Sequence, residues 1–158
     1  MITTPQIVQT SAQLTACISL VIPREEIQTV MGPGIEELMK VVADQGIEMV
    51  GPWFTHHRRR PSETFDFEIC VPVGAAVVAS GRVRPNELQA ATVARAVYSG
   101  SYEGLGSAWS QLHDWITENG HAPAKDLWEC YVAGPESSAD PGDWRTELNQ
   151  PMIQQTLS

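Results

Sequence analysis

Basic residues are scarce in this sequence of 158 residues, which holds 10 lysines and arginines against 19 aspartates and glutamates. The net charge of −9 at pH 7 disfavours direct binding to nucleic acid, because phosphate contacts need a basic surface. It also disfavours anionic membrane surfaces, since like charges repel. We therefore expect neither nucleic acid nor a membrane as a direct partner.

Long hydrophobic runs and a secretory signal are also missing. No uninterrupted apolar run approaches the roughly 20 residues that a membrane-spanning helix needs. The opening residues MITTPQ have neither the basic start nor the apolar core of a signal peptide. These absences predict a cytoplasmic protein. The length and the hydrophobic fraction of 42% fit a single globular domain over residues 1–158.

Cysteine is rare, and none of the three cysteines has CxxC spacing. Cys17, Cys70 and Cys130 each stand singly in an apparent strand, which is typical of small core residues in a reducing compartment. Adjacent His56 and His57 would point to opposite faces of a strand, so they are a poor metal pair. The sequence predicts no metal site, no disulfide framework and no cofactor.

One acid stands inside an otherwise apolar and aromatic stretch, KDLWECYVA at residues 125–133. The stretch reads as a strand, so Leu127, Glu129 and Tyr131 should share one face. A carboxylate with such neighbours loses hydration, which raises its pKa unless a cation or hydrogen-bond donors compensate. Glu129 is therefore suited to receiving a cationic ligand or to exchanging a proton. Alternatively, it is an edge-strand residue that points into water.

The remaining pattern predicts strands alternating with two main helices. The clearest helices have apolar residues at helical spacing and end at Gly46 and Gly120. In the second, the stripe with Trp109, Leu112 and Trp115 is interpreted as core. The expected helices cover residues 35–45 and 103–119, after an interruption at residues 32–34. The expected strands cover residues 7–22, with a possible break at 11–13, and residues 50–59, 64–73, 87–98, 125–133 and 143–152.

The two halves of the chain resemble each other. A shift of 74 positions matches Gly46 with Gly120 and Thr55 with Glu129. Each half reads strand, helix, strand, strand, which predicts an α+β fold of duplicated βαββ units. We expect pseudo-twofold symmetry, an antiparallel sheet, two main helices and a central ligand groove. The predicted repeats cover about residues 6–73 and 87–153, joined by a linker at about 74–86.

The sequence also resembles the GyrI-like small-molecule-binding domains, which are also called bacterial transcription-activator effector-binding domains. The resemblance spans nearly the whole chain and is most specific after Glu87. It is carried by YSGSYEGL at residues 98–105, AWSQLHDWI at 108–116, LWECY at 127–131, and DWRTEL at 143–148 with Pro151.

The resemblance implies two βαββ units around a pocket for amphipathic and often cationic compounds. Family members that respond to many drugs have an acid at the pocket floor, which Glu129 matches. Trp144 matches an aromatic of the final strand, and Tyr102 a pocket-wall position. The other expected ligand-binding residues are Leu127 and Tyr131 beside Glu129, and Trp53, Thr55, His57 and Phe65 in the first half. No DNA-binding segment precedes the first strand in this sequence, so we expect a stand-alone protein.

The residues and the resemblance together leave three functions open, of which the second and third are implied by the resemblance. The first is a binding protein for an aromatic, cationic or amphipathic small molecule. The second is a hydrolase that uses Glu129 to detoxify cyclopropane-containing or other electrophilic natural products. The third is a protein that inhibits a DNA enzyme such as gyrase by binding to it. Either a monomer or a dimer is compatible with all three functions. Glu68 and Glu147 have the opposite parity to their apolar neighbours and are expected to face solvent.

Overall fold

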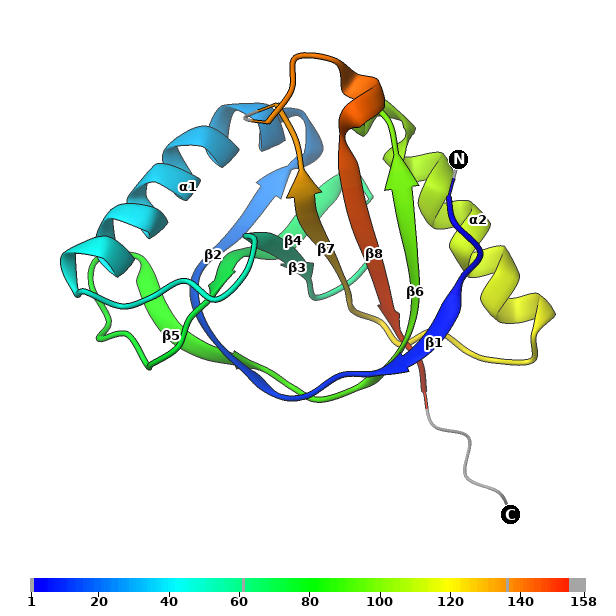
Figure 1. The fold of residues 1–158 in the computed structure, drawn as a ribbon, viewed down its shortest axis with the longest axis horizontal. Coiled ribbons are helices and arrows are strands. Elements are labelled where there is room, and N and C mark those ends of the chain that lie inside the picture. Colours follow the sequence, from blue (N-terminus) through cyan, green and yellow to red (C-terminus); the bar gives the residue numbers. More distant parts are fainter. Residues whose placement is uncertain (1, 61, 136, 154–158) are drawn as a thin grey trace. The chain divides into compact units, whose positions relative to one another are not determined.

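The computed structural model describes residues 2–60, 62–135 and 137–153. The chain forms two compact units, which we describe separately. The first unit comprises residues 11–90, and the second comprises residues 1–10 together with residues 91–158. The helices and strands of both units are labelled in Figure 1.

The first unit is an antiparallel sheet with one long helix. Its strands lie in the order β5-β2-β4-β3, and α1 packs on β2 and β4 (Figure 1). Leu38 and Val42 of α1 lie in one core cluster with Ile18 and Ile69 of the sheet. The elements are β2 Gln13–Pro23, the 3-10 helix η1 Arg24–Glu26, α1 Ile27–Asp44, β3 Phe54–His57, β4 Thr64–Pro72 and β5 Val83–Leu88.

The second unit has a related arrangement, with strands in the order β1-β6-β8-β7. Its helix α2 buries Leu112 and Ile116 against Ala96 and Leu148 of the sheet. The elements are β1 Gln6–Gln9, β6 Thr92–Ser99, the 3-10 helix η2 Tyr102–Gly104, α2 Leu105–Glu118, β7 Leu127–Ala133, the 3-10 helix η3 Pro141–Asp143 and β8 Arg145–Pro151.

Strand order and register recur from one unit to the other. In the first unit Ile69 of β4 lies opposite Thr55 of β3, and in the second Leu148 of β8 lies opposite Glu129 of β7. Matching Ile69 with Leu148, as the sequence comparison of the two halves does, therefore also matches Thr55 with Glu129, and the internal repeat itself stays a prediction. The α+β class, the antiparallel pairing and the two main helices are confirmed. The pseudo-twofold axis and its central groove stay predictions.

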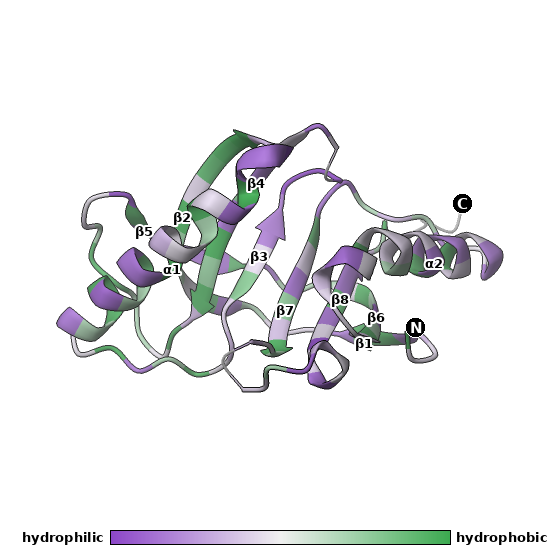
Figure 2. Cartoon of the chain, turned by 90° about the horizontal axis from the view of Figure 1, so that it is seen from above, coloured by the Kyte–Doolittle hydropathy of each residue, from purple (hydrophilic) through white to green (hydrophobic). Residues whose placement is uncertain are grey.

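Helix α1 is longer than its sequence indicated. The expected interruption at residues 32–34 is wrong, because α1 runs unbroken through Pro33. Proline inside a helix removes one backbone hydrogen bond and costs about 3 kcal/mol, which the packing of the apolar helix face offsets. Gly34 allows α1 to approach β4 closely, since a Cβ at this position would lie 2.7 Å from Cδ1 of Ile69. The hydropathy colouring in Figure 2 shows polar positions alternating with apolar ones along α1.

The first predicted strand divides between the two units. Residues 7–22 form β1 and β2, and β1 pairs with β6, placing Gln6 opposite Arg95. The predicted strand at residues 87–98 is likewise two strands, since β5 ends at Leu88 and β6 begins at Thr92. The predicted repeats at 6–73 and 87–153 therefore differ from the compact units at their ends. Backbone pairing with distant strands sets these boundaries, and local sequence does not encode it.

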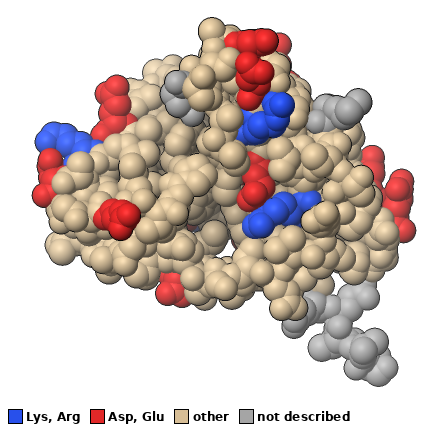
Figure 3. Space-filling model, viewed as in Figure 1, with Lys and Arg blue, Asp and Glu red and all other residues tan. Residues whose placement is uncertain are grey.

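Acidic groups are spread over the face of the molecule drawn in Figure 3, where basic groups are few. This distribution agrees with the net charge of −9. Within the described residues, neither helix combines the length and the hydropathy needed to cross a bilayer.

The tight fit between α1 and the sheet yields a prediction about two helix glycines. Gly34→Leu should lower the free energy of unfolding by about 1–3 kcal/mol, because the new side chain must displace buried Ile69. Gly32→Ala is the matched control, since no atom lies within 4 Å of its added Cβ. It should raise stability by about 0.5–1 kcal/mol through helix propensity. Urea unfolding followed by circular dichroism measures both, and equal stability of the two variants would contradict this packing.

Candidate functional site

Glu129 lies buried in the second unit, with both carboxylate oxygens engaged. Its side chain is 7% exposed. The indole Nε1 of Trp109 on α2 donates to Oε1 at 2.6 Å, and the hydroxyl of Tyr131 donates to Oε2 at 2.7 Å. Glu129 and Tyr131 share one face of β7, as strand alternation requires. The alternative that Glu129 points into water is therefore wrong.

Burial governs the acid–base properties of this carboxyl group. Desolvation raises the pKa of Glu129 above its ordinary value, and the hydrogen bonds from Tyr131 and Trp109 oppose that increase. No basic side chain contributes to the shift. The ionised form is stabilised by neutral donors only, so a cation beside it would gain a strong electrostatic partner.

An aromatic row continues from Glu129 toward solvent. The ring of Tyr131 meets that of Tyr102 edge-on, with centroids 5.9 Å apart. Tyr102 in turn lies 5.1 Å from the ring of Trp144 at an interplanar angle of 32°. Tyr102 is 37% exposed, so the row leads from a buried acid to the surface. We call Glu129, Trp109, Tyr131, Tyr102 and Trp144 the Glu129 cluster.

Neighbouring contacts hold the rings of this cluster in place. Trp144 donates from Nε1 to the carbonyl of Ser138 at 2.9 Å. Below Tyr102, the hydroxyl of Tyr98 donates to the carbonyl of Ser101 at 2.7 Å. Gly104 has no room for a Cβ, because the Tyr98 hydroxyl occupies that space. The turn that carries Tyr102 is thus fixed by a buried side chain of β6.

Leu127 is almost fully buried in the core cluster that includes Leu112 and Ile116. Leu127 therefore anchors β7 to the core of the second unit. Five site residues were predicted in the second half of the chain. Four of them, Glu129, Tyr131, Tyr102 and Trp144, belong to the Glu129 cluster, and Leu127 packs in the core instead.

The predicted site residues of the first half lie in the first unit. His57 and Thr55 are buried on β3, being 5% and 2% exposed. The His57 ring stacks on Phe67 at 5.2 Å and meets Phe65 edge-on at 5.7 Å. Phe65 and Trp53 are partly buried and pack against the first unit's core. That these residues line a site together with Glu129 stays a prediction.

Sequence reasoning missed Trp109 as a member of the site. Its place in an apolar helical stripe indicated core, and Trp109 is indeed buried, being 6% exposed. A buried indole N–H usually has a hydrogen-bond partner, and that requirement was the available signal. Helix periodicity could not identify the partner, because Glu129 comes 20 residues later on another element.

Comparison with known proteins agrees with this fold. The sequence matches the model of the GyrI-like family, described as a GyrI-like small molecule binding domain, over residues 3–152. A search of curated proteins by sequence found no match.

Several solved structures share the fold at low identity. The C-terminal domain of EcmrR aligns with a TM-score of 0.86 and 20% identity, over 96% of this chain and 98% of that domain. In the EcmrR–DNA complex the chain spans 58% of the longer EcmrR chain. SAV2435 bound to tetraphenylphosphonium aligns with a TM-score of 0.65 and 13% identity, over 96% and 94%. A hydrolase from Listeria innocua aligns with a TM-score of 0.67 and 9% identity, over 94% of this chain and 91% of that one.

Buried His57 generates a prediction about acid stability. Burial lowers the pKa of His57 to about 4, and neighbouring His56 adds to the effect. Between that value and the ordinary 6.5, the unfolded chain binds more protons, so stability should fall as the pH drops through this window. The loss is about 3 kcal/mol. His57→Phe should reduce this pH dependence in urea titrations between pH 7 and 4, whereas exposed His121→Phe should retain it. An unchanged slope in His57→Phe would contradict the assignment.

Proposed function

Because the chain belongs to the family of GyrI-like small molecule binding domains, we propose that its second unit binds an aromatic or amphipathic cation beside Glu129. One observation carries this proposal. Within the part of the chain that the structure describes, a carboxylate that is 7% exposed has two neutral hydrogen-bond donors, and one of them, Tyr131, begins a row of aromatic rings.

The energetics favour a lipophilic cation over a small hydrated one. A buried carboxylate without a cationic partner pays a desolvation cost, which an incoming positive charge reduces. The faces of Tyr131, Tyr102 and Trp144 each add about 0.5–2 kcal/mol of cation–π attraction when a cation reaches them. A strongly hydrated ion would lose more solvation energy on entering such a site than a cation shielded by apolar groups.

Tyr102 is the most exposed member of the aromatic row, and its ring lies between those of Tyr131 and Trp144. We expect Tyr102 to swing outward when a ligand enters and to cover it afterward. The two hydrogen bonds from Trp109 and Tyr131 would then keep the carboxylate oriented while the ligand supplies the missing charge.

The choice of ligand class is supported by a structural relative. SAV2435, which shares the fold, is bound to tetraphenylphosphonium in its solved structure. That compound is a cation whose charge lies inside four phenyl rings, which is the chemistry that the Glu129 cluster suits. It is therefore a rational first probe for this chain.

Tetraphenylphosphonium should bind the purified protein and change its tryptophan fluorescence, because Trp109 and Trp144 belong to the cluster. Glu129→Gln should weaken binding by about tenfold to a hundredfold, since it removes one charge-assisted interaction of about 1.5–3 kcal/mol. Binding to the unaltered protein should strengthen as pH rises, because burial raises the pKa of Glu129 and only the ionised form attracts the cation. Fluorescence titration measures both effects.

The matched control for this titration is Glu147→Gln. It removes the same charge from neighbouring β8, on a side chain that bonds Asn149 and pairs with Arg95. Affinity should change less than about twofold in this variant, because the Glu147 side chain points to the opposite face of the sheet from Glu129 and its charge is already paired with Arg95. Equal losses in the two variants would overturn the role of Glu129 and leave only the overall acidity of the protein.

A hydrolase is the second candidate, and the raised pKa of Glu129 favours it. A carboxyl group that retains its proton above the ordinary range can protonate a leaving group. The Tyr131 hydroxyl at 2.7 Å would orient that proton donor. A cyclopropane-containing electrophile is the substrate class that the family resemblance implies.

Turnover separates a hydrolase from a binding protein. If the chain is a hydrolase, incubation with a cyclopropane-containing alkylating compound should yield a ring-opened product heavier by one water, detected by mass spectrometry. Glu129→Gln should abolish product formation while retaining measurable binding. Product formed at the same rate by Glu129→Gln would remove Glu129 from the chemistry, and the absence of product with the unaltered protein would leave binding as the function.

Inhibition of a DNA enzyme such as gyrase stays a prediction, as do the cytoplasmic location and the monomeric or dimeric state. The acidic surface, with a net charge of −9, is the property that such a protein partner would recognise. Capture of a partner would then survive Glu129→Gln, in contrast to ligand binding at the Glu129 cluster.

A further inference from the structure

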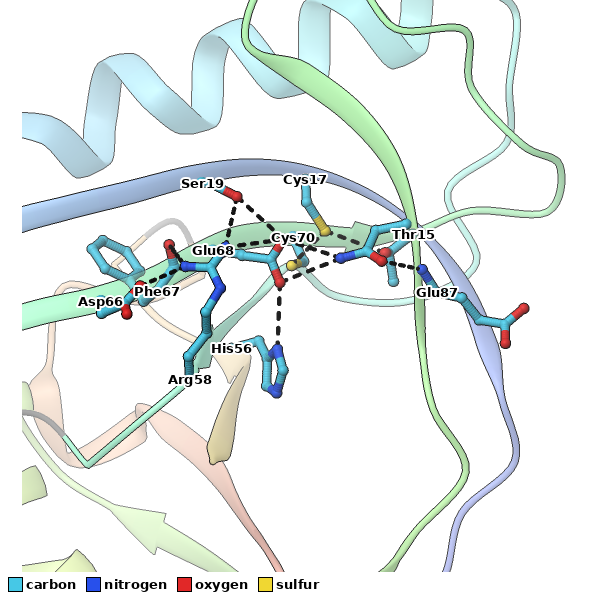
Figure 4. A network of polar contacts seen from close by, with 11 residues as sticks. Thr15, Cys17, Ser19, His56, Arg58, Asp66, Phe67, Glu68, Cys70 and Glu87 are labelled. Carbon is cyan, nitrogen blue, oxygen red and sulfur yellow. Dashed lines mark hydrogen bonds and ion pairs between the residues drawn. The ribbon is translucent and has the colours of Figure 1, made fainter. Parts of the chain in front are cut away.

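A second group of chemically active side chains lies in the first unit, remote in sequence from the Glu129 cluster. Cys17 of β2 lies directly opposite Cys70 of β4, and their Sγ atoms are 2.7 Å apart. Both are 2% exposed. Figure 4 shows the two sulfur atoms facing each other between the strands. Their neighbours Ile18 and Ile69 point into the core under α1, so the thiols occupy the other face of the sheet.

Glu68 adds a carboxylate to the two thiols. One ligand atom from each of Cys17, Cys70 and Glu68 lies within 4.8 Å of the others, and all three residues are buried. Glu68 is 7% exposed, so the expectation that it faces solvent is wrong. Strand parity correctly placed it opposite the core face, but that face is also covered here.

The carboxylate of Glu68 is held in place by a shell of polar groups. Nδ2 of Asn86 donates to Oε2 at 3.0 Å, and Oγ of Ser19 lies 3.4 Å from the same atom. Nδ1 of His56 lies 3.5 Å from Oε1. Figure 4 shows Ser19 and His56 reaching Glu68 from different strands. Such outer partners orient a ligand in protein metal sites.

A small pocket in the first unit borders these groups. It is lined by Cys17, Cys70, Glu68, His56 and Asn86 among others. An ion entering it would meet both sulfur atoms, the carboxylate and the imidazole of His56.

We propose that Cys17, Cys70 and Glu68 bind a thiophilic metal ion such as zinc, with His56 or a water molecule as the fourth ligand. Two thiolates with nitrogen and oxygen donors match the ligand preference of zinc, which binds sulfur at about 2.3 Å in a tetrahedron. Such a tetrahedron holds its sulfur atoms about 3.7 Å apart. The Sγ atoms must therefore separate by about 1 Å from their present contact, which small χ1 rotations supply.

Charge balance favours a divalent ion at this position. Two thiolates and the Glu68 carboxylate carry three negative charges. A divalent ion supplies two positive charges, and the guanidinium of Arg58, which lies 3.6 Å from Oε2 of Glu68 and also pairs with Asp66, adds to them. The ion thus removes most of the excess negative charge of the buried ligands, which lowers the cost of desolvation.

Without an ion the same site disfavours free thiolates. Burial raises the pKa of Cys70 well above its ordinary value, and the thiol of Cys17 adds to this effect. Protonated thiols react slowly with oxidants and disulfides. A metal ion displaces the protons directly, so metal binding requires no reactive thiolate beforehand.

The test uses the reduced, full-length protein after removal of metal by a chelator. Cobalt(II) should bind one ion per chain and produce the near-ultraviolet absorption of thiolate-to-cobalt charge transfer, and zinc should displace it. Cys17→Ser or Cys70→Ser should each reduce that absorption to about half or less and weaken zinc binding by at least about tenfold, through loss of one of two thiolates. Glu68→Gln should weaken zinc binding by about tenfold to a hundredfold.

Cys130→Ser is the matched control, because Cys130 lies on β7 in the second unit. It should retain both the cobalt absorption and the zinc affinity, and thermal unfolding by circular dichroism verifies that each variant is folded. Cobalt binding without the charge-transfer absorption, or an unchanged absorption in Cys17→Ser, overturns the proposal. So does a reduced protein that binds no metal and instead, with added peroxide, forms a Cys17–Cys70 disulfide detected by peptide mass spectrometry. Tetraphenylphosphonium binding is measured independently of all these outcomes.

Discussion

The buried carboxylate of Glu129 is the constraint around which the second unit is built. An acid that is 7% exposed cannot remain ionised without donors, and Trp109 and Tyr131 supply one to each oxygen. These two hydrogen bonds join α2 to β7 and fix the indole and phenol rings. The ring of Tyr102 contacts both Tyr131 and Trp144 and so extends the row. The contacts that hold α2 on β7 are therefore the same ones that orient the carboxylate of the proposed ligand site.

The two units use one strand register for different chemistry. Cys70 follows Ile69 on β4 and faces Cys17, whereas Asn149 follows Leu148 on β8 and faces Arg95. The first pair places two thiols in contact, and the second forms a hydrogen bond of 2.7 Å from Arg95 to Asn149. Likewise Thr55 stands where the other unit has Glu129. The same strand pairing thus carries different side chains in the two units, so the chemistry of each unit depends on its own sequence.

Local pattern predicted the elements well and their partners poorly. Alternation on β4 and β7 predicted the correct faces for Phe67 and Glu129, because a period of two depends only on neighbouring residues. The break expected at Gly32 and Pro33 was wrong, because packing of α1 on the sheet outweighs an unfavourable local residue. The exposure expected for Glu68 was wrong for a similar reason. Parity identifies a face of a sheet, and only the surrounding chain decides whether that face is covered.

By itself, the sequence determined the α+β class and placed Glu129 and Tyr131 on one face of an aromatic strand, since these follow from composition and short-range periodicity. Tyr102 and Trp144 were expected only from the resemblance to the GyrI-like family. Tertiary structure decided that Trp109 bonds Glu129 and that Cys17 meets Cys70 across 53 positions of chain. Both contacts depend on which strands and helices become neighbours. That choice minimises the free energy of the whole core, so no window of sequence contains it.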